Sequence, residues 1–156
     1  GQCPCEAEPK LQQVFDKIRT IAGQENVKAS ETEVGSMIYA VRPGDGSARE
    51  QAASCQRVLG GLANICKEYA TKRYRSNVIN WGMLPFLIPE GDLPFSNGDY
   101  LFIPDVKKAV EDKLTEIQAY VVKDGELKSF TLQMGGLTDD EREIILKGCL
   151  INYNRR

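Results

Sequence analysis

Apolar side chains recur at helical spacing near the start of the chain, between Pro9 and Gly23. They fall every three or four residues, and a glycine is suited to end a helix. The apolar positions are Leu11, Val14, Phe15, Ile18, Ile21 and Ala22. This spacing predicts an amphipathic helix with one face packed on the core.

Between residues 33 and 88 the pattern changes to short apolar runs that alternate with helical segments. The predicted order is a strand at Glu33–Val41, a helix at Ser47–Leu59, a strand at Leu62–Cys66, a helix at Lys67–Asn77 and an irregular apolar passage at Val78–Ile88. The first strand is almost wholly apolar from Met37 to Val41, so we expect it to be buried. A strand, loop, helix, strand order indicates an α/β fold.

Turn residues and apolar runs define the second half of the chain. The predicted elements are a strand at Tyr100–Ile103, a helix at Pro104–Lys113, two strands at Leu114–Val122 and Leu127–Gln133, and a final helix from Thr138 to Asn154. Lys123-Asp124-Gly125-Glu126 predicts a hairpin turn between the two strands. Thr138 and Glu141 predict a capping box. We find neither an internal repeat nor a low-complexity linker, so a single domain over residues 1–156 is expected.

The composition is that of an ordinary globular chain. Its 156 residues are 42% hydrophobic and 27% charged, and its formal net charge is -2. Disorder and strong nonspecific binding of nucleic acid are therefore not expected. The chain contains no histidine, which excludes Ser-His-Asp chemistry, Cys-His chemistry and imidazole metal ligation by its own residues.

The five cysteines form an odd set without framework spacing: Cys3, Cys5, Cys55, Cys66 and Cys149. No signal peptide is recognisable, so a reduced, cytoplasmic protein is expected. The pair Cys3-Pro4-Cys5 resembles half of a metal site, but no second pair completes it, and we expect no metal on this chain. No apolar stretch approaches the roughly 20 residues of a membrane helix, so we expect no membrane partner.

The loop Gly44-Asp45-Gly46-Ser47-Ala48-Arg49-Glu50 lies between a predicted strand and a predicted helix. Its glycines let the backbone approach a ligand, and a helix start offers free N–H groups to an anion. Arg49 adds a forked donor that matches a carboxylate or a phosphate. The alternative is a capping box, in which Ser47 accepts a backbone N–H and Glu50 reaches back.

Four ordered motifs resemble the C-terminal swivelling domain of aconitase-family hydro-lyases. They are Gly44–Glu50, Leu59-Gly60-Gly61, Ala63–Lys67 and Asn77–Pro85. The closing segment Leu137–Asn154 also resembles the family's last helix. The resemblance implies a swivelling three-layer β/β/α domain with a mixed, barrel-like sheet and flanking helices.

The resemblance also implies a chemistry. Aconitase-type enzymes remove and add water across a carbon–carbon bond of a hydroxy polycarboxylate, and the open iron of their [4Fe–4S] cluster acts as a Lewis acid. The family's base is matched by Ser47 and its carboxylate-binding arginine by Arg49. Gly46, Ala48 and Arg42 are further candidates for the substrate site, although Ala48 replaces a family serine and Arg42 matches no family residue.

The family's cluster ligands include a C-x-x-C pair, which this sequence lacks. We therefore expect a partner, either cluster-bearing domains or a large subunit, and no hydratase activity from this chain alone. Gly1 in place of a methionine, with a long polar stretch before Tyr39, favours an excised domain over a separate subunit. The sequence does not identify the hydroxy acid.

Two non-catalytic alternatives remain open. Basic residues interleave with tyrosines at Lys67, Tyr69, Lys72, Arg73, Tyr74 and Arg75. Such a pattern is able to bind RNA, or it is the solvated face of a helix whose tyrosines pack inward. The slightly negative net charge favours the second interpretation, so we expect no nucleic-acid partner. A simple carboxylate-binding module is the other alternative, and it does not need the Ser47 hydroxyl.

Overall fold

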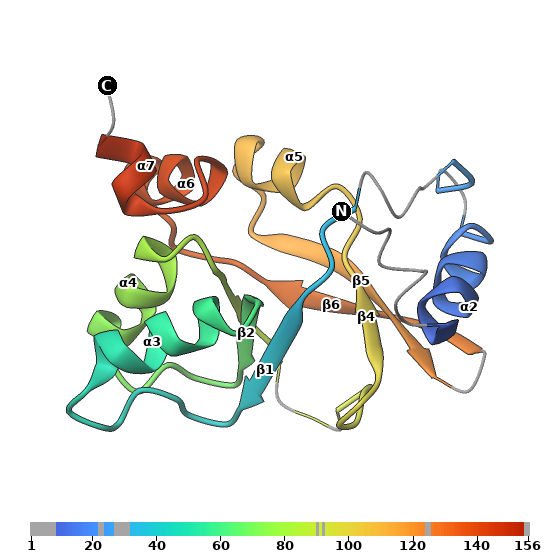
Figure 1. Ribbon diagram of the computed structural model, residues 1–156, viewed down its shortest axis with the longest axis horizontal. Helices are drawn as coiled ribbons and strands as arrows, with labels where there is room; N and C mark the ends of the chain where they lie inside the picture. The colour runs from blue at the N-terminus through green and yellow to red at the C-terminus, as the bar shows by residue number, and fades with distance from the viewer. Residues whose placement is uncertain are drawn as a thin grey trace. The chain divides into compact units, whose positions relative to one another are not determined.

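The chain is described here by a computed structural model (Figure 1). It describes residues 9–21, 24–26, 32–89, 91, 93–123 and 126–154. The predictions for Cys3 and Cys5, for the helix end at Ala22 and Gly23, and for the turn residues Asp124 and Gly125 lie outside the described residues.

Six strands form one mixed sheet in the order β1-β2-β3-β6-β5-β4. Their bounds are β1 Ser36–Ala40, β2 Gly61–Cys66, β3 Leu84–Leu87, β4 Tyr100–Phe102, β5 Glu116–Lys123 and β6 Glu126–Gln133. Strands β1, β2 and β3 are parallel, whereas β6 is antiparallel to β3 and β4 is antiparallel to β5. The predicted α/β class and mixed sheet are confirmed.

The predicted barrel-like closure is wrong, because the sheet is open over the described residues and has β1 and β4 as its end strands. Closure would require these two strands to pair. The three residues of β4 offer few backbone groups for this, and all three pair with β5.

Six helices accompany the sheet in the described residues. Their bounds are α2 Pro9–Ile18, α3 Arg49–Val58, α4 Lys72–Asn80, α5 Val106–Glu111, α6 Asp139–Leu146 and α7 Leu150–Asn154. The predicted apolar face of the first helix is confirmed at Leu11, Val14, Phe15 and Ile18, although the helix ends at Ile18. None of these described helices is both long and apolar enough to cross a membrane.

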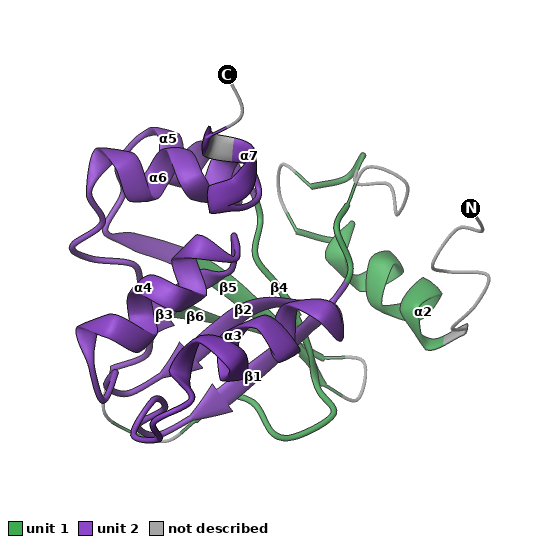
Figure 2. Cartoon of the chain, turned by 60° about the vertical axis from the view of Figure 1, so that its left-hand side comes forward, with its two compact units in different colours: residues 1–34, 91–104, 118–131 green, residues 35–90, 105–117, 132–156 purple. Residues whose placement is uncertain are grey.

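The chain divides into two compact units that alternate along the sequence (Figure 2). Unit 1 comprises residues 1–34, 91–104 and 118–131, and unit 2 comprises residues 35–90, 105–117 and 132–156. Strands β5 and β6 each contribute residues to both units. The single swivel domain over residues 1–156 stays a prediction.

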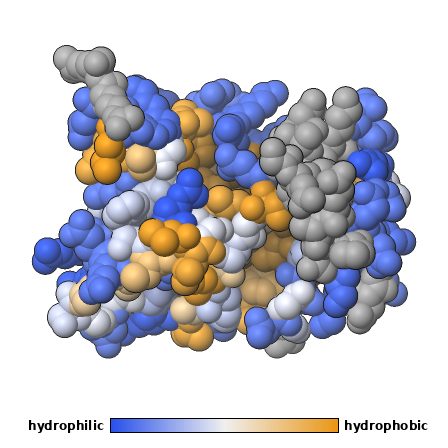
Figure 3. Space-filling view, in the orientation of Figure 1, coloured by the Kyte–Doolittle hydropathy of each residue, from blue (hydrophilic) through white to orange (hydrophobic). Residues whose placement is uncertain are grey.

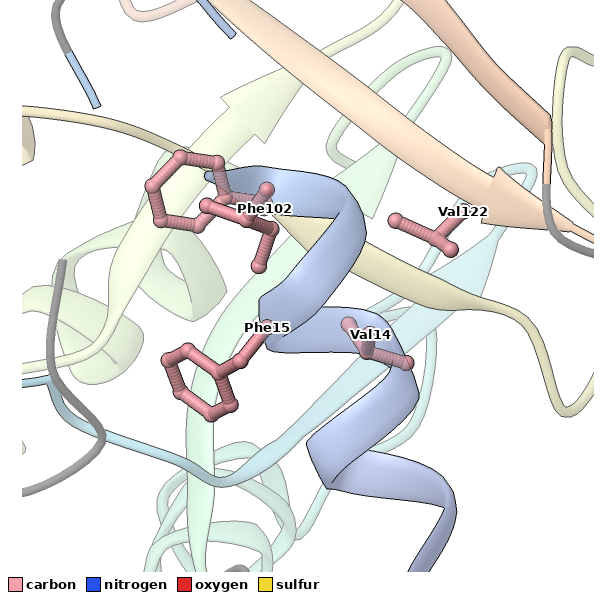
Figure 4. Packing of buried hydrophobic residues seen from close by; sticks show 5 residues of the cluster. Val14, Phe15, Phe102 and Val122 are labelled. Atoms are coloured by element: carbon pink, nitrogen blue, oxygen red, sulfur yellow. The ribbon is translucent and has the colours of Figure 1, made fainter. Parts of the chain in front are cut away.

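Unit 1 has its own apolar core. Val14, Phe15 and Ile18 of α2 pack with Phe102 of β4 and Val122 of β5. Figure 4 shows Val14 and Phe15 projecting from α2 near these two strand residues. The helical spacing of the α2 side chains thus supplies one layer of this core.

Unit 2 has a second core, formed by Ala53, Tyr74, Val78 and Met83. Helix α3 lies beside α4, and α4 lies beside α6. Strand β2 runs through the interior, with five of its six residues buried. The parallel strands and these helices position the candidate site.

Four sequence predictions in unit 2 were wrong. Strand β1 is exposed or half-buried along its length because it is the end strand of the sheet. The helix predicted at Lys67–Asn77 begins at Lys72, after the Thr71 cap, and part of the passage predicted to be irregular is the strand β3, despite Pro85. The predicted final helix is divided into α6 and α7, because Gly148 has a φ of 88° between them.

Candidate functional site

The carboxyl ends of the three parallel strands lie at one edge of the sheet. Ala40 of β1 is in register with Cys66 of β2, and Cys66 is in register with Leu87 of β3. The loops that follow β1 and β2 are joined by the backbone hydrogen bonds Glu68 N to Val41 O, 3.1 Å, and Ala70 N to Pro43 O, 3.0 Å. Ligands of open α/β sheets bind beside such strand ends.

Gly44 fixes the path of the loop after β1. Its φ is 96°, a conformation that L side chains rarely adopt, and an added Cβ would overlap the ring of Tyr74. Tyr74 is buried, and its hydroxyl oxygen accepts hydrogen bonds from Gln56 Nε2 at 2.9 Å and Asn64 Nδ2 at 3.0 Å. The loop therefore rests on a fully anchored ring in α4.

Helix α3 begins one residue later than a capping serine would place it. Its N-cap is Ala48, with φ −88° and ψ 51°, and it has no side-chain cap hydrogen bond. Ser47 is exposed, and its hydroxyl has no hydrogen bond among the described residues. The capping-box alternative for Ser47 and Glu50 is wrong, because the backbone at the N-cap is not extended and Ser47 lies outside the helix.

A hollow of about 480 Å³ lies against α3 and α4, open to solvent. On the α3 side, Ser47, Gln51 and Ser54 recur at helical spacing, and Ala48, Arg49 and Glu50 complete that wall. On the α4 side the lining residues are Arg73, Asn77 and Trp81, which are four residues apart and share one helix face. The structure thus brings Ser47 and Arg49 into one hollow. Their spacing predicted this convergence with Ser47 at the helix cap, and that position of Ser47 is wrong, because the N-cap is Ala48.

Charge in the hollow is positive, because two arginines line it with a single glutamate. Arg49 is half-buried, and its Nε donates to Gly44 O at 3.0 Å. This bond orients the guanidinium group relative to the loop. Arg73 is exposed and forms no ion pair with a described carboxylate. Two forked donors and a serine hydroxyl are a suitable set for a carboxylate ligand.

The α4 wall is held at its end by backbone contact with the turn between α6 and α7. Gly82, with φ 73°, comes so close to Gly148 that an added Cβ would overlap the carbonyl group of Gly148. On another side of α4, Arg75 Nη2 donates to Gly135 O at 2.9 Å, and Arg75 Nη1 lies 3.7 Å from Glu141 Oε2. These contacts fix the position of the residues that line the hollow.

The other predicted site residues differ in placement. Gly46 is exposed, and an added Cβ would meet no atom within 4 Å. Ala48 lines the hollow, whereas Arg42 does not; Arg42 Nε lies 3.7 Å from Glu68 Oε2 on the exposed surface. The structure therefore brings Ala48, but not Arg42, to Ser47 and Arg49.

Sequence reasoning missed the role of α4 in this hollow. In the sequence Arg73 belongs to a basic stretch, Asn77 to one of the four motifs, and Trp81 to the passage predicted to be irregular. Their four-residue spacing was the available signal, since it places them on one face of a helix. A helix that ends at Asn77, as predicted, does not include Trp81, so the shared face of the three residues was not recognised.

The tyrosines of the basic stretch pack inward, in agreement with the solvated-helix interpretation. Tyr74 is buried, and the Tyr69 hydroxyl is buried beside the Cys66 thiol, without a hydrogen bond of good geometry to a described residue. Burial raises the pKa of Tyr69. Burial also raises the pKa of the Cys66 thiol to about 11. Tyr69 is half-buried and packs against the core of unit 2 that contains Tyr74.

The described cysteines do not form a cluster site. The residues that the structure describes contain no group of three or more Cys, Asp or Glu side chains that could hold a metal ion. Cys66 is buried and its raised pKa keeps it a thiol, whereas iron–sulfur ligands are thiolates. These residues do not fit a [4Fe–4S] cluster.

Comparisons with known proteins agree with the motif pattern. Residues 15–91 match the family described as the aconitase C-terminal domain. Among solved structures, the chain is similar to the crystal structure of 3-isopropylmalate dehydratase (LeuD) from Methanocaldococcus jannaschii, with 28% sequence identity and a TM-score of 0.56. That match covers 83% of this chain and 71% of the other. A search of curated protein sequences found no match.

Residues 15–91 of the chain are thereby identified as part of an aconitase-type C-terminal (swivel) domain. The structure of the chain is similar in particular to the LeuD protein. The loop that carries Ser47 and Arg49 lies within the matched residues.

Proposed function

We propose that this chain is the swivel domain of an aconitase-type hydro-lyase that acts on a hydroxy polycarboxylate. In this proposal Ser47 is the base and Arg49 binds a substrate carboxylate. The observation that carries it is that both residues line one hollow against α3 and α4, while the Ser47 hydroxyl is not used to cap α3.

Ser47 removes a proton from the carbon next to a substrate carboxylate. The electron pair of the broken C–H bond forms the carbon–carbon double bond, and the hydroxyl group leaves the neighbouring carbon with the electron pair of the broken C–O bond. A serine hydroxyl acts as a base only where positive charge stabilises its ionised form. Arg49, Arg73 and the free N–H groups at the start of α3 supply that charge.

Arg49 orients the substrate. Its Nε is bound to Gly44 O, so the two terminal nitrogens are directed by a fixed loop. Among the described residues no carboxylate pairs with them. A guanidinium group held in this way binds a carboxylate in a bidentate manner.

A cluster-bearing partner completes the proposed enzyme, either as further domains of one chain or as a large subunit. It holds the [4Fe–4S] cluster that the family implies, and that cluster supplies the Lewis acid for the departing hydroxyl group. A suitable contact surface is formed by exposed apolar residues: Ile38 in β1, Val41 just after it, and Val58 and Leu59 at the end of α3. Figure 3 shows apolar side chains gathered on the face that β1 and α3 present in that view.

The test is Ser47→Ala in the enzyme completed by its cluster-bearing part. Turnover should fall about 10²- to 10⁴-fold, the usual size of a general-base contribution, with little change in KM. The free energy of unfolding of the chain should not change, because no cap hydrogen bond is lost. Unchanged turnover would show a carboxylate-binding module that does not use this hydroxyl.

Arg49→Lys is the companion variant. Lysine keeps the charge but loses the fork, so KM should rise while turnover changes less. An unchanged KM would remove Arg49 from the substrate site. Full activity of the chain without a partner would refute the division of labour proposed here.

A further inference from the structure

We propose that Arg73 binds a second carboxylate of the substrate, so that the hollow selects dicarboxylates over monocarboxylates. This inference rests on the proposed function, in which Arg49 binds the first carboxylate. It goes further because Arg73 comes from another helix and from outside the loop that carries Ser47. The argument starts from the two arginines that line one hollow from α3 and α4.

Arg73 and Arg75 lie two positions apart on α4 and have different roles. Residues two apart on a helix point to nearly opposite sides. Arg75 donates to Gly135 O and pairs with Glu141, so its charge stabilises contacts within the fold. Arg73 lines the hollow and has neither an ion pair nor a hydrogen bond with a described residue. Its charge therefore has no structural use in the described part of the molecule.

A dicarboxylate needs a second anion-binding group in the hollow, and the other lining residues of the α3 wall do not supply a cationic one. Ala48 has no side-chain donor, and the Glu50 carboxylate in the same hollow repels anions. Asn77 lies one turn from Arg73 on the same face and offers an amide donor beside it. Arg73 and Asn77 together are the only side chains from α4 on this described wall that donate strongly to an anion.

The size of the hollow suits a small dicarboxylate. Its volume of about 480 Å³ lies within the range of roughly 300–1,000 Å³ typical of small-molecule sites. Trp81, the only tryptophan of the chain, lines the same hollow. Its fluorescence therefore reports binding there without a label.

The experiment titrates the full chain with succinate and with butyrate, which has the same four-carbon length but one carboxylate. Binding is followed by Trp81 fluorescence and by calorimetry. The wild-type chain should bind succinate more tightly than butyrate. Arg73→Gln should weaken succinate binding about tenfold, the effect of one lost charge-assisted hydrogen bond, and should leave butyrate binding within about twofold.

Lys72→Gln is the matched control, since it removes the same charge from the neighbouring exposed position, which does not line the hollow. It should leave succinate affinity within about twofold. An equal loss in Lys72→Gln and Arg73→Gln would reduce the effect to general charge and overturn the inference. Thermal unfolding of both variants should match that of the wild type, because neither side chain has a described ion pair.

Arg49→Gln separates this inference from the proposed function. If Arg49→Gln weakens both ligands and Arg73→Gln weakens neither, the second-carboxylate site is wrong and the role of Arg49 stands. If Arg49→Gln has no effect on either ligand, the proposed carboxylate clamp is wrong. Equal affinity of the wild-type chain for succinate and butyrate would overturn the inference directly.

Discussion

Helices α3 and α6 both belong to unit 2, and the chain before each carries a hydroxyl residue followed three positions later by glutamate. At α6 this pattern forms a full capping box. Glu141 N donates to Thr138 Oγ1 at 3.2 Å, and Thr138 N donates to Glu141 Oε2 at 3.3 Å. At α3 the N-cap is Ala48, and Ser47 forms no such bond.

The backbone explains the difference. Thr138 is extended, with φ −76° and ψ 164°, which directs its side chain back over the first turn. Ala48 has ψ 51°, and the preceding loop is held against Tyr74 by Gly44. One helix start is thus stabilised by its own side chains, whereas the loop before the other is held by a distant ring and leaves the serine hydroxyl outside the cap.

Of the variants that test how the two helix starts are held, Gly44→Ala should lower the stability of the chain most. The new Cβ combines a left-handed backbone with overlap on Tyr74, which we expect to cost about 2–4 kcal/mol of unfolding free energy. Urea unfolding measures this. Gly46→Ala is the control, since its Cβ meets nothing and the change should stay below about 0.5 kcal/mol. Equal losses would mean that Tyr74 does not fix the loop.

Thr138→Ala and Ser47→Ala test the two helix starts directly. Loss of the cap at α6 should lower the unfolding free energy by about 1 kcal/mol. The same change at Ser47 should leave it unaltered, because no cap bond exists there. Both values come from the same denaturation series. If Ser47→Ala also lowered the unfolding free energy by about 1 kcal/mol, Ser47 would be a structural cap after all.

Ala48→Ser asks whether α3 is able to accept a cap. A hydroxyl at the true N-cap position should increase stability, but by less than the roughly 1 kcal/mol that Thr138 contributes, because the backbone at residue 48 is not extended. Thermal unfolding is the measurement. A gain as large as the Thr138 contribution would show that the loop before α3 adjusts freely.

The smallest expected effect concerns Asp139 in the first turn of α6. The Lys113 ammonium, 2.9 Å away, and then Arg142 hold the pKa of Asp139 below its usual range. A lowered folded-state pKa means that the stabilisation is present above the unfolded value, near 3.9, and is lost as the pH falls through the folded value. Asp139→Asn should therefore be slightly less stable than the wild type at pH 7 and equal to it near pH 2. A pH-independent difference would contradict this origin.

Much of the fold was predictable because it depends on local patterns. The apolar spacing of α2, the strand β2 and the α6 capping box all follow from residues within one element. The pairing of Ser47 with Arg49 was predictable for the same reason. The position of the α3 cap was not predictable, because it depends on a contact between Gly44 and Tyr74, two residues that are thirty positions apart in the sequence. Arg73 was missed because the bounds of α4 decide which side chains share its face.

The close approach of Gly82 and Gly148 restricts how this domain can be recombined with its relatives. Gly82 tolerates no side chain, because its Cβ would overlap the carbonyl group of Gly148, and Gly148 has a φ of 88°, a conformation that L side chains rarely adopt. A hybrid that joined residues 35–90 of this chain to the closing helices of a related domain would need glycine on both sides of the junction. Exchange of these two segments is thus governed by a pair of residues that lie outside the hollow.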